Sequence, residues 1–326
     1  MTTMSRAARP PAAALPTAVA LLIVYVVWGS TYLAIAYMVD TMPPFLSAGA
    51  RYLAAGLIML AFLWLHGRLR RSPGERERPT FAHWRSAAII GTLLLLGGNG
   101  FVVLAEQPGL LPSGLAAVLV ATVPIWLNLF DAVLHRRRPS GLVLGGVAAG
   151  FVGVVILLLP ADGIAEINPL GVGMVVFATL SWAIGSLYQR RAPLPRSPWL
   201  GTGMEMAAGG VALVLAGTLT GEPGRTAVDS FSTESIVALV YLVVFGSLVA
   251  FSAYIWLLNN AAVSTVGTYA YVNPVVAVAL GAWLRSEPIT LRTLLAAAVI
   301  IGAVVAMVSG RPRGEPSPAP AATSEA

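Results

Sequence analysis

Residues 17–38 read TAVALLIVYVVWGSTYLAIAYM, an uncharged and largely apolar run of 22 residues. At a rise of about 1.5 Å per residue, a helix of this length spans the roughly 30 Å hydrocarbon core of a bilayer. The run is longer than the apolar region of a secretory signal peptide, and further runs of the same kind follow it. We therefore interpret it as a membrane span rather than a cleaved leader.

Nine more apolar stretches of similar length follow this first one. The ten predicted spans are residues 17–38, 45–65, 86–105, 113–134, 141–160, 169–188, 198–218, 235–257, 262–284 and 291–309. Composition agrees with a membrane protein, because only 10% of the residues are charged, against roughly 25% in soluble domains. The sequence predicts an all-α polytopic membrane protein with ten transmembrane helices.

The positions of the basic residues predict the topology. All 20 of them are arginine, and basic residues in short connections are retained on the cytoplasmic side. With the N-terminus inside, sixteen arginines lie in cytoplasmic tails and loops, three lie in outer loops, and Arg51 lies within a span. Both termini are therefore expected in the cytoplasm. Because the arginines are spread over many loops, they favour no nucleic-acid partner.

Several kinds of chemistry are excluded by residue types that the chain lacks. It contains no lysine and no cysteine, which excludes a Walker-type phosphate loop and thiolate metal sites. Its three histidines are scattered beside arginine-rich loops and none lies in a predicted span, so converging metal ligands are not expected. The sequence therefore predicts no enzyme, metal or cofactor. The expected partners are the lipid bilayer and a small-molecule substrate, and the oligomeric state is left open.

The chain contains an internal repeat. A shift of 154 residues aligns Trp28 with Trp182 and Gly56 with Gly210, and a shift of about 150 residues aligns spans 4 and 5 with spans 9 and 10. Because five is odd, two five-span halves enter the membrane in opposite directions, an inverted repeat of the kind that secondary transporters use. The predicted organisation is a cytoplasmic tail at 1–16, a first five-helix repeat at 17–160, a second at 165–310 and a disordered cytoplasmic tail at 311–326.

Two prolines lie near the middle of predicted spans, Pro124 in span 4 and Pro274 in span 9. Each removes a backbone donor and crowds the carbonyl four residues earlier, so that carbonyl needs another partner or water. A kink beside a cavity supplies both, whereas a kink that serves packing alone is the alternative. Their paired positions favour a cavity at the midplane.

Polar and aromatic residues at related depths are candidates to line that cavity. The full set is Trp28, Tyr32, Asn99, Thr122, Pro124, Trp126, Asn128, Trp182, Tyr188, Tyr269, Tyr271, Asn273 and Pro274. Aromatic residues near span ends also form belts at the membrane interface, and buried amides also join helices. Both alternatives stay open for each residue.

Three ionisable residues in or beside the spans are candidates for coupling or gating. Arg51 is expected to extend its head group outward or to bind carbonyls, Glu205 to carry a coupling proton, and Glu106 to form an outer gate or a loop cap. The repeat aligns Arg51 with Glu205, but the inversion separates them in depth by roughly 10 Å, which argues against an ion pair. Small residues such as Gly145 and Gly302 recur along spans 5 and 10 and predict close helix contact.

Five motifs resemble the EamA family of the drug/metabolite transporter superfamily, and most of all its YedA-like exporter branch. They are WGSTY at 28–32, ARYLAAG at 50–56, GGNGFVVLAEQ at 97–107, PSGLAAVLVATVPIW at 112–126 and YAYVNPVVAVALGAWLRSEPITLRTLLAAAVIIGAVV at 269–305. A glutamate that often follows span 4 in the family is absent here, where Arg138 precedes Pro139, while the second half keeps Glu287 before Pro288.

The resemblance implies a carrier in the bacterial inner membrane. Such a carrier would export small metabolites, amino acids or related solutes, or drugs, by alternating access through a central midplane cavity. The competing functions are a membrane-embedded enzyme for lipid-linked substrates, a lipid flippase and a passive pore. The enzyme would need clustered carboxylates, histidines or a metal site, which the sequence lacks.

Overall fold

The computed structural model describes residues 14–69, 78–134, 136, 141–158, 167–225, 227–260 and 269–309, and every regular element within them is helical. The predicted all-α class is therefore confirmed. Of the two predicted tails, residues 1–13 and 311–326 lie outside the described residues. Residues 14–16, the end of the predicted N-terminal tail, belong to the first helix.

Three long helices each contain a π-helical stretch between two α-helical parts. They are α1 (Ala14–Ile23), η2 (Val24–Trp28) and α2 (Gly29–Val39); α4 (Phe81–Gly91), η3 (Thr92–Gly100) and α5 (Phe101–Ala105); and α11 (Thr233–Tyr241), η6 (Leu242–Val249) and α12 (Ala250–Asn260). π-helical turns are rare and occur frequently at functional sites. Their presence in three helices marks these helices as candidates for lining a site.

The remaining α-helices are uninterrupted. They are α3 (Pro44–Leu69), α6 (Ser113–Val120), α7 (Val123–Leu134), α8 (Gly141–Leu158), α9 (Pro169–Gln189), α10 (Pro198–Leu219), α14 (Tyr269–Arg285) and α15 (Leu291–Ser309), and two short 3-10 turns are η4 (Glu222–Arg225) and η5 (Val228–Ser230). Several begin at a polar cap: Ser197 accepts from the Leu200 amide and Asn168 from the Leu170 amide, each just before a proline at the first helical position.

Six helices in the described part of the chain are long and apolar enough to cross a membrane. These are Leu15–Val39, Pro44–His66, Phe81–Ala105, Pro169–Gln189, Pro198–Leu219 and Thr233–Tyr254. The other four predicted spans coincide with shorter apolar helices, at Ser113–Leu127, Leu144–Gly153, Val272–Arg285 and Leu291–Gly302. The fourth predicted span is divided, because α6 ends at Val120 and α7 begins one residue before Pro124. Ten crossings therefore stay a prediction.

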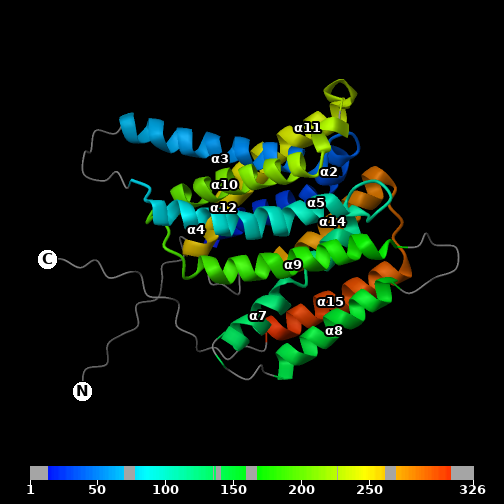
Figure 1. The fold of residues 1–326 in the computed structure, drawn as a ribbon. Coiled ribbons are helices and arrows are strands. Elements are labelled where there is room, and N and C mark those ends of the chain that lie inside the picture. Colours follow the sequence, from blue (N-terminus) through cyan, green and yellow to red (C-terminus); the bar gives the residue numbers. More distant parts are fainter. Residues whose placement is uncertain are drawn as a thin grey trace, which may run out of the picture.

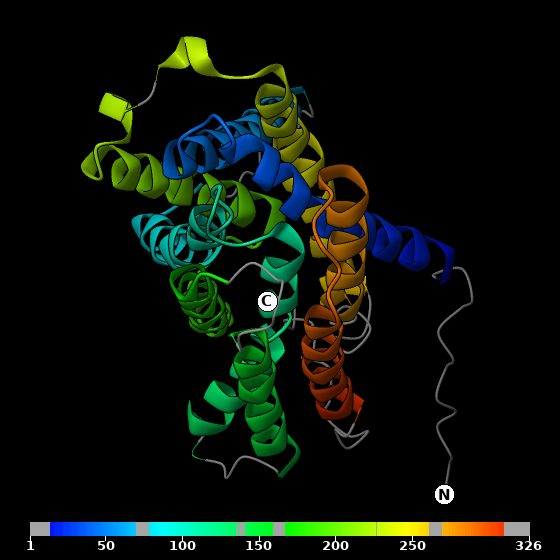
Figure 2. The ribbon, with the colours of Figure 1, turned by 90° about the vertical axis from the view of Figure 1, so that its right-hand side faces the viewer.

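Helices from the two halves of the chain pack against each other in pairs. α3 packs along α10, α5 and η3 along α9, α2 along α11, α6 along α14, and α8 along α15. Figure 1 shows α3 and α10 in the upper part of the bundle and α8 with α15 at its lower edge, and Figure 2 again places α8 and α15 together. The main hydrophobic core lies between α2, α3, α4 and α10. It includes Ile35, Met38, Ile90 and Leu213, each nearly fully buried.

Glycines allow the backbones of α3 and α10 to approach closely. A Cβ atom added at Gly56 would lie 2.5 Å from the amide nitrogen of Ala207, and one added at Gly210 would lie 2.5 Å from that of Leu53. By contrast, Gly145 and Gly302 have no atom within 4 Å of an added Cβ. The predicted small-residue contact between spans 5 and 10 is therefore absent at these two positions, but it is present at Gly153, where an added Cβ would lie 2.5 Å from the Ile300 Cγ1.

Large apolar side chains cover much of the outer surface. Phe62 is 63% exposed, Leu215 56% and Val237 61%. Contiguous apolar surface is unfavourable in water and marks contact with a membrane or a partner. Together with the long apolar helices, it shows a protein whose outer faces suit lipid.

Candidate functional site

A cavity lies between the two halves of the chain and beside Pro124 and Pro274. It offers about 110 Å³ to the centre of a water molecule, which is room for several waters or a small solute. Eight of the predicted cavity residues line it: Trp28, Tyr32, Asn99, Pro124, Trp182, Tyr269, Asn273 and Pro274. Helices of both halves contribute, so any movement between the halves would reshape this space.

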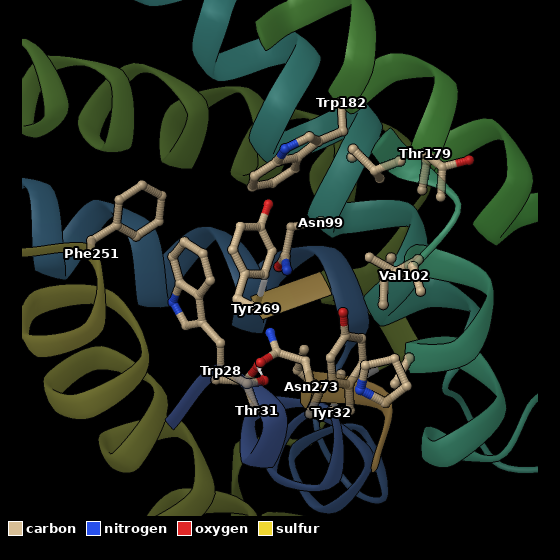
Figure 3. Close-up of a pocket in the computed structure, with 18 of the residues that line it drawn as sticks. Trp28, Thr31, Tyr32, Asn99, Val102, Thr179, Trp182, Phe251, Tyr269 and Asn273 are labelled. Carbon is tan, nitrogen blue, oxygen red and sulfur yellow. Dashed lines mark hydrogen bonds between the residues drawn. The ribbon is translucent and has the colours of Figure 1, made fainter. Parts of the chain in front are cut away.

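Aromatic rings form one wall of the cavity. The ring centroid of Trp28 lies 5.5 Å from Phe251, 5.0 Å from Tyr254 and 5.4 Å from Tyr269. The indole nitrogen of Trp28 donates to the carbonyl of Gly246 at 3.2 Å, which fixes the orientation of the ring. Figure 3 shows the Tyr269 hydroxyl pointing toward Trp182, which comes from α9. The ring contacts and the indole hydrogen bond together hold Trp28 in place in this aromatic wall.

The two cavity amides have different surroundings. With its amide oriented so that nitrogen donates, Asn273 bonds the carbonyls of Tyr269 at 3.2 Å and Tyr25 at 3.3 Å, and so joins α14 to η2. The Asn99 Oδ1 atom is buried and has no hydrogen-bond partner within the described residues. Asn273 thus acts as a link between helices, whereas the acceptor of Asn99 has no protein partner among the described residues.

Arg51 also lines the cavity, and its side chain is only 3% exposed. Its Nε donates to the Ser247 Oγ at 3.0 Å, and its guanidinium carbon lies 4.6 Å from the centroid of the Tyr52 ring. The expectation that the head group extends outward was therefore wrong. Gly246 explains the difference, because a Cβ there would lie 3.1 Å from the Arg51 Nη2 and would push the head group away.

Three predicted cavity residues do not line it, and two more cannot be placed from the described side chains. Thr122 is buried and its hydroxyl donates to the Leu119 carbonyl at 2.7 Å. Trp126 stacks on Phe130, and Tyr188 packs against the main core. The side chains of Asn128 and Tyr271 lie outside the described residues.

The sequence reasoning missed twelve of the lining residues, and four of these carry polar or aromatic side chains. Thr31 directly precedes Tyr32, Tyr52 directly follows Arg51, Thr179 lies one helical turn before Trp182, and Phe251 is an ordinary apolar residue of α12. One-turn spacing from a candidate would have found Thr179, since residues three apart share a helix face. Phe251 carries no signal in the sequence.

The two candidate carboxylates lie away from the cavity. Glu205 is 6% exposed on α10 and both of its oxygens accept from the Gln189 Nε2, at 3.2 and 3.3 Å. Glu106, just after α5, is 4% exposed, and neither of its oxygens has a hydrogen-bond partner within the described residues. Burial raises the pKa of Glu106 well above its usual range; Glu287 raises it further and Arg285 opposes this. Glu106 therefore holds its proton more readily than an ordinary carboxyl.

One end of the bundle, which we call the loop end, contains the loops at 40–43, 106–112 and 286–290. Polar contacts join segments of the chain at this end. A second cavity of about 420 Å³ lies there, lined by Glu106 among others. Asp40 and Arg285 form a two-pronged ion pair, with nitrogen to oxygen distances of 2.7 and 3.0 Å. Thr41 donates to the Ser235 Oγ at 2.8 Å. These contacts join segments of the first half to segments of the second.

Two glutamates of the second half cap helices of the first half. The oxygens of Glu222 accept from the amides of Phe45 and Leu46 at 3.0 and 2.8 Å, at the start of α3. Those of Glu287 accept from the amide and hydroxyl of Ser113 and from the amide of Gly114, at the start of α6. Carboxylates at helix N-termini satisfy free amides and complement the helix dipole. Glu287 thus has a structural role that the sequence did not show.

Comparison with protein families gives two matches to one family. The model of the "EamA-like transporter family" matches residues 15–159 and again residues 169–309. Together these matches cover most of the chain, and each covers about one half of it.

Individual proteins are similar over nearly the whole chain. The "Uncharacterized inner membrane transporter YedA" of Escherichia coli (strain K12) is 40% identical over 297 residues, which cover 91% of this chain and 92% of that protein. The "Uncharacterized transporter YvbV" of Bacillus subtilis (strain 168) is 24% identical over 311 residues, 92% of this chain and 93% of that protein. A solved structure described only as the crystal structure of a protein shares the fold, with a TM-score of 0.58, 21% identity and coverage of 91% and 96%.

Proposed function

The chain belongs to the EamA-like transporter family, and we propose that it is a secondary carrier that exports small solutes from the cytoplasm by alternating access. The observation that supports this most is the cavity between the halves, lined by side chains of α2, α3 and η3 on one side and of α9, α12 and α14 on the other. A site shared by two bodies opens to one side or the other when those bodies rock.

Reciprocal contacts between α3 and α10 support a two-fold relation between the halves. Gly56 meets Ala207 and Gly210 meets Leu53; a shift of 154 residues converts each contact into the other. The same shift relates the contact of Gly49 with Val214 to that of Gly203 with Leu60. Contacts that exchange in this way are what a two-fold axis produces. We therefore propose two inverted five-helix repeats at 17–160 and 165–310.

The orientation follows from the arginines under this proposal. Ten crossings with both termini in the cytoplasm of the inner membrane place the loop end, with the Asp40 and Arg285 pair, on the outer side. The structure would then have its outer side closed. The neighbouring Glu106 would respond to the pH outside the cell.

A counterflow assay tests the carrier. Purified protein in liposomes loaded with unlabelled tryptophan, threonine, adenosine or tetraphenylphosphonium should accumulate the matching labelled solute in at least one case, and the rate should saturate. Accumulation against a gradient requires a site that is exposed to each side in turn. Linear, unsaturable flux indicates a passive pore, and movement of labelled lipid without solute flux indicates a flippase. Chemical conversion of a lipid-linked substrate would support the enzyme instead.

Proton coupling is expected to depend on Glu106, whose oxygens have no hydrogen-bond partner among the described residues, rather than on Glu205, which is held by Gln189. Glu106 has a raised pKa, so it is protonated at lower pH and loses its proton as the pH rises through that raised value. Glu106→Gln cannot exchange a proton and should remove the dependence of transport on a pH gradient, measured in liposomes with an imposed gradient. Glu205→Gln, which can still accept one hydrogen bond from Gln189 through its amide oxygen, is the matched control. Gradient-dependent transport by Glu106→Gln would contradict the assignment.

A further inference from the structure

The central cavity contains a buried positive charge that has no counter-charge. Arg51 is the only Arg, Asp, Glu or His among the described residues that line this cavity. An arginine stays protonated at any physiological pH. Placing such a charge away from water is costly unless an opposite charge or hydrogen-bond acceptors meet it.

The hydrogen bonds of Arg51, which lines the cavity, are incomplete. Its Nε donates to the Ser247 hydroxyl, and the Tyr52 ring lies beside the guanidinium. Its Nη1 is buried without a hydrogen-bond partner among the residues that the structure describes. A planar guanidinium with a free edge is suited to a carboxylate, which accepts two parallel hydrogen bonds.

The local backbone of the second half holds the guanidinium in this position. Gly246 leaves room for the Nη2, and its carbonyl accepts from the Trp28 indole. Trp28 therefore stands against the same π-helical stretch that binds Arg51. An anion at Arg51 would lie in a cavity that also has the Trp28 and Tyr269 rings in its wall, which suit an apolar body.

We infer that this cavity selects small organic carboxylates with an apolar or aromatic body, and that Arg51 binds the carboxylate. The inference rests on the proposed carrier function and adds a substrate class and a specificity-determining residue to it. It disfavours cationic solutes, which would meet the uncompensated guanidinium. It also disfavours simple inorganic anions, because the aromatic wall would stay empty.

Three probes of matched shape test the inference by binding to the purified full chain: 3-phenylpropanoate, its neutral amide and 3-phenylpropylamine. The affinity, measured by intrinsic tryptophan fluorescence and by thermal shift, should be at least about tenfold higher for the carboxylate than for the amide. The amine should bind weakest. Inorganic phosphate should produce no comparable shift. Equal binding of the three probes, no detectable binding of the carboxylate, or an equal effect of phosphate overturns the inference.

Variants assign the preference to one residue. Arg51→Gln should lose the discrimination between carboxylate and amide, and Arg51→Lys should recover part of it because the charge is restored. Arg225→Gln, which removes the same charge from an exposed position, should keep it. The carboxylate preference of the wild-type protein is measured first. The inference can therefore be rejected even if Arg51→Gln does not fold. Retained preference in a folded Arg51→Gln overturns the assignment.

Transport of the same probes separates this inference from the proposed function. Counterflow of the amide with no preference for the carboxylate would leave a carrier but remove the carboxylate selectivity. A carboxylate preference in binding, with no counterflow of any probe, would leave the selectivity but remove the carrier.

Discussion

Gly210→Leu is expected to prevent the chain from forming a stable bundle. A Cβ at this position already lies 2.5 Å from the Leu53 amide nitrogen and 2.9 Å from its Cα, and these backbone atoms cannot rotate away. Overpacking of a core costs about 1–3 kcal/mol where side chains can adjust, so a contact with backbone should reach the upper end or exceed it. The expected result is loss of the monodisperse peak in detergent and a large fall in the thermal midpoint.

The control for this prediction is the same substitution at a position with free space. An added Cβ at Gly302, on α15, has nothing within 4 Å, so Gly302→Leu should leave the peak and the midpoint nearly unchanged. Gly56→Leu, the repeat mate of Gly210, should be as harmful as Gly210→Leu because it meets the backbone of α10. If Gly302→Leu were as harmful as Gly210→Leu, leucine itself rather than the close contact would be the cause.

The sequence predicted the helices of this fold well. Charge is so scarce between residues 17 and 65 that long apolar helices follow from composition and length alone. α15 begins and ends where the apolar run does, at Leu291 and Ser309. The break between α6 and α7 was predicted only as a kink at Pro124, since a proline marks a disruption but not its extent.

The sequence predicted less about which side of each helix faces the cavity. In helices that are apolar on almost every side, no hydrophobic stripe defines an inward face. Trp126 and Asn99 were both expected at the cavity, but only Asn99 reaches it. Arg51 was misplaced for a related reason: the partner that holds it, Ser247, is 196 residues away on a helix whose neighbours the sequence does not specify.

A disulfide across the loop end is expected to stop transport. Thr41 and Ser235 touch through their hydroxyls at 2.8 Å and join the first half to the second. The chain contains no cysteine, so a Thr41→Cys, Ser235→Cys double variant places its only two thiols where the two hydroxyls now touch, and any intramolecular disulfide joins these two positions. If the loop end must open for solute to leave, counterflow in liposomes should fall to background after oxidation and return after reduction.

The controls decide whether such a loss reflects locking. Each single-cysteine variant, oxidised and reduced in the same way, should transport at the same rate, because neither can join the halves. The oxidised double variant should still bind solute in its closed-end form, since the central cavity is lined by neither residue. Lost transport with retained binding therefore identifies a carrier held in one of its two states. Undiminished counterflow in fully cross-linked protein would show that this end stays closed during transport, and alternating access through it would have to be abandoned.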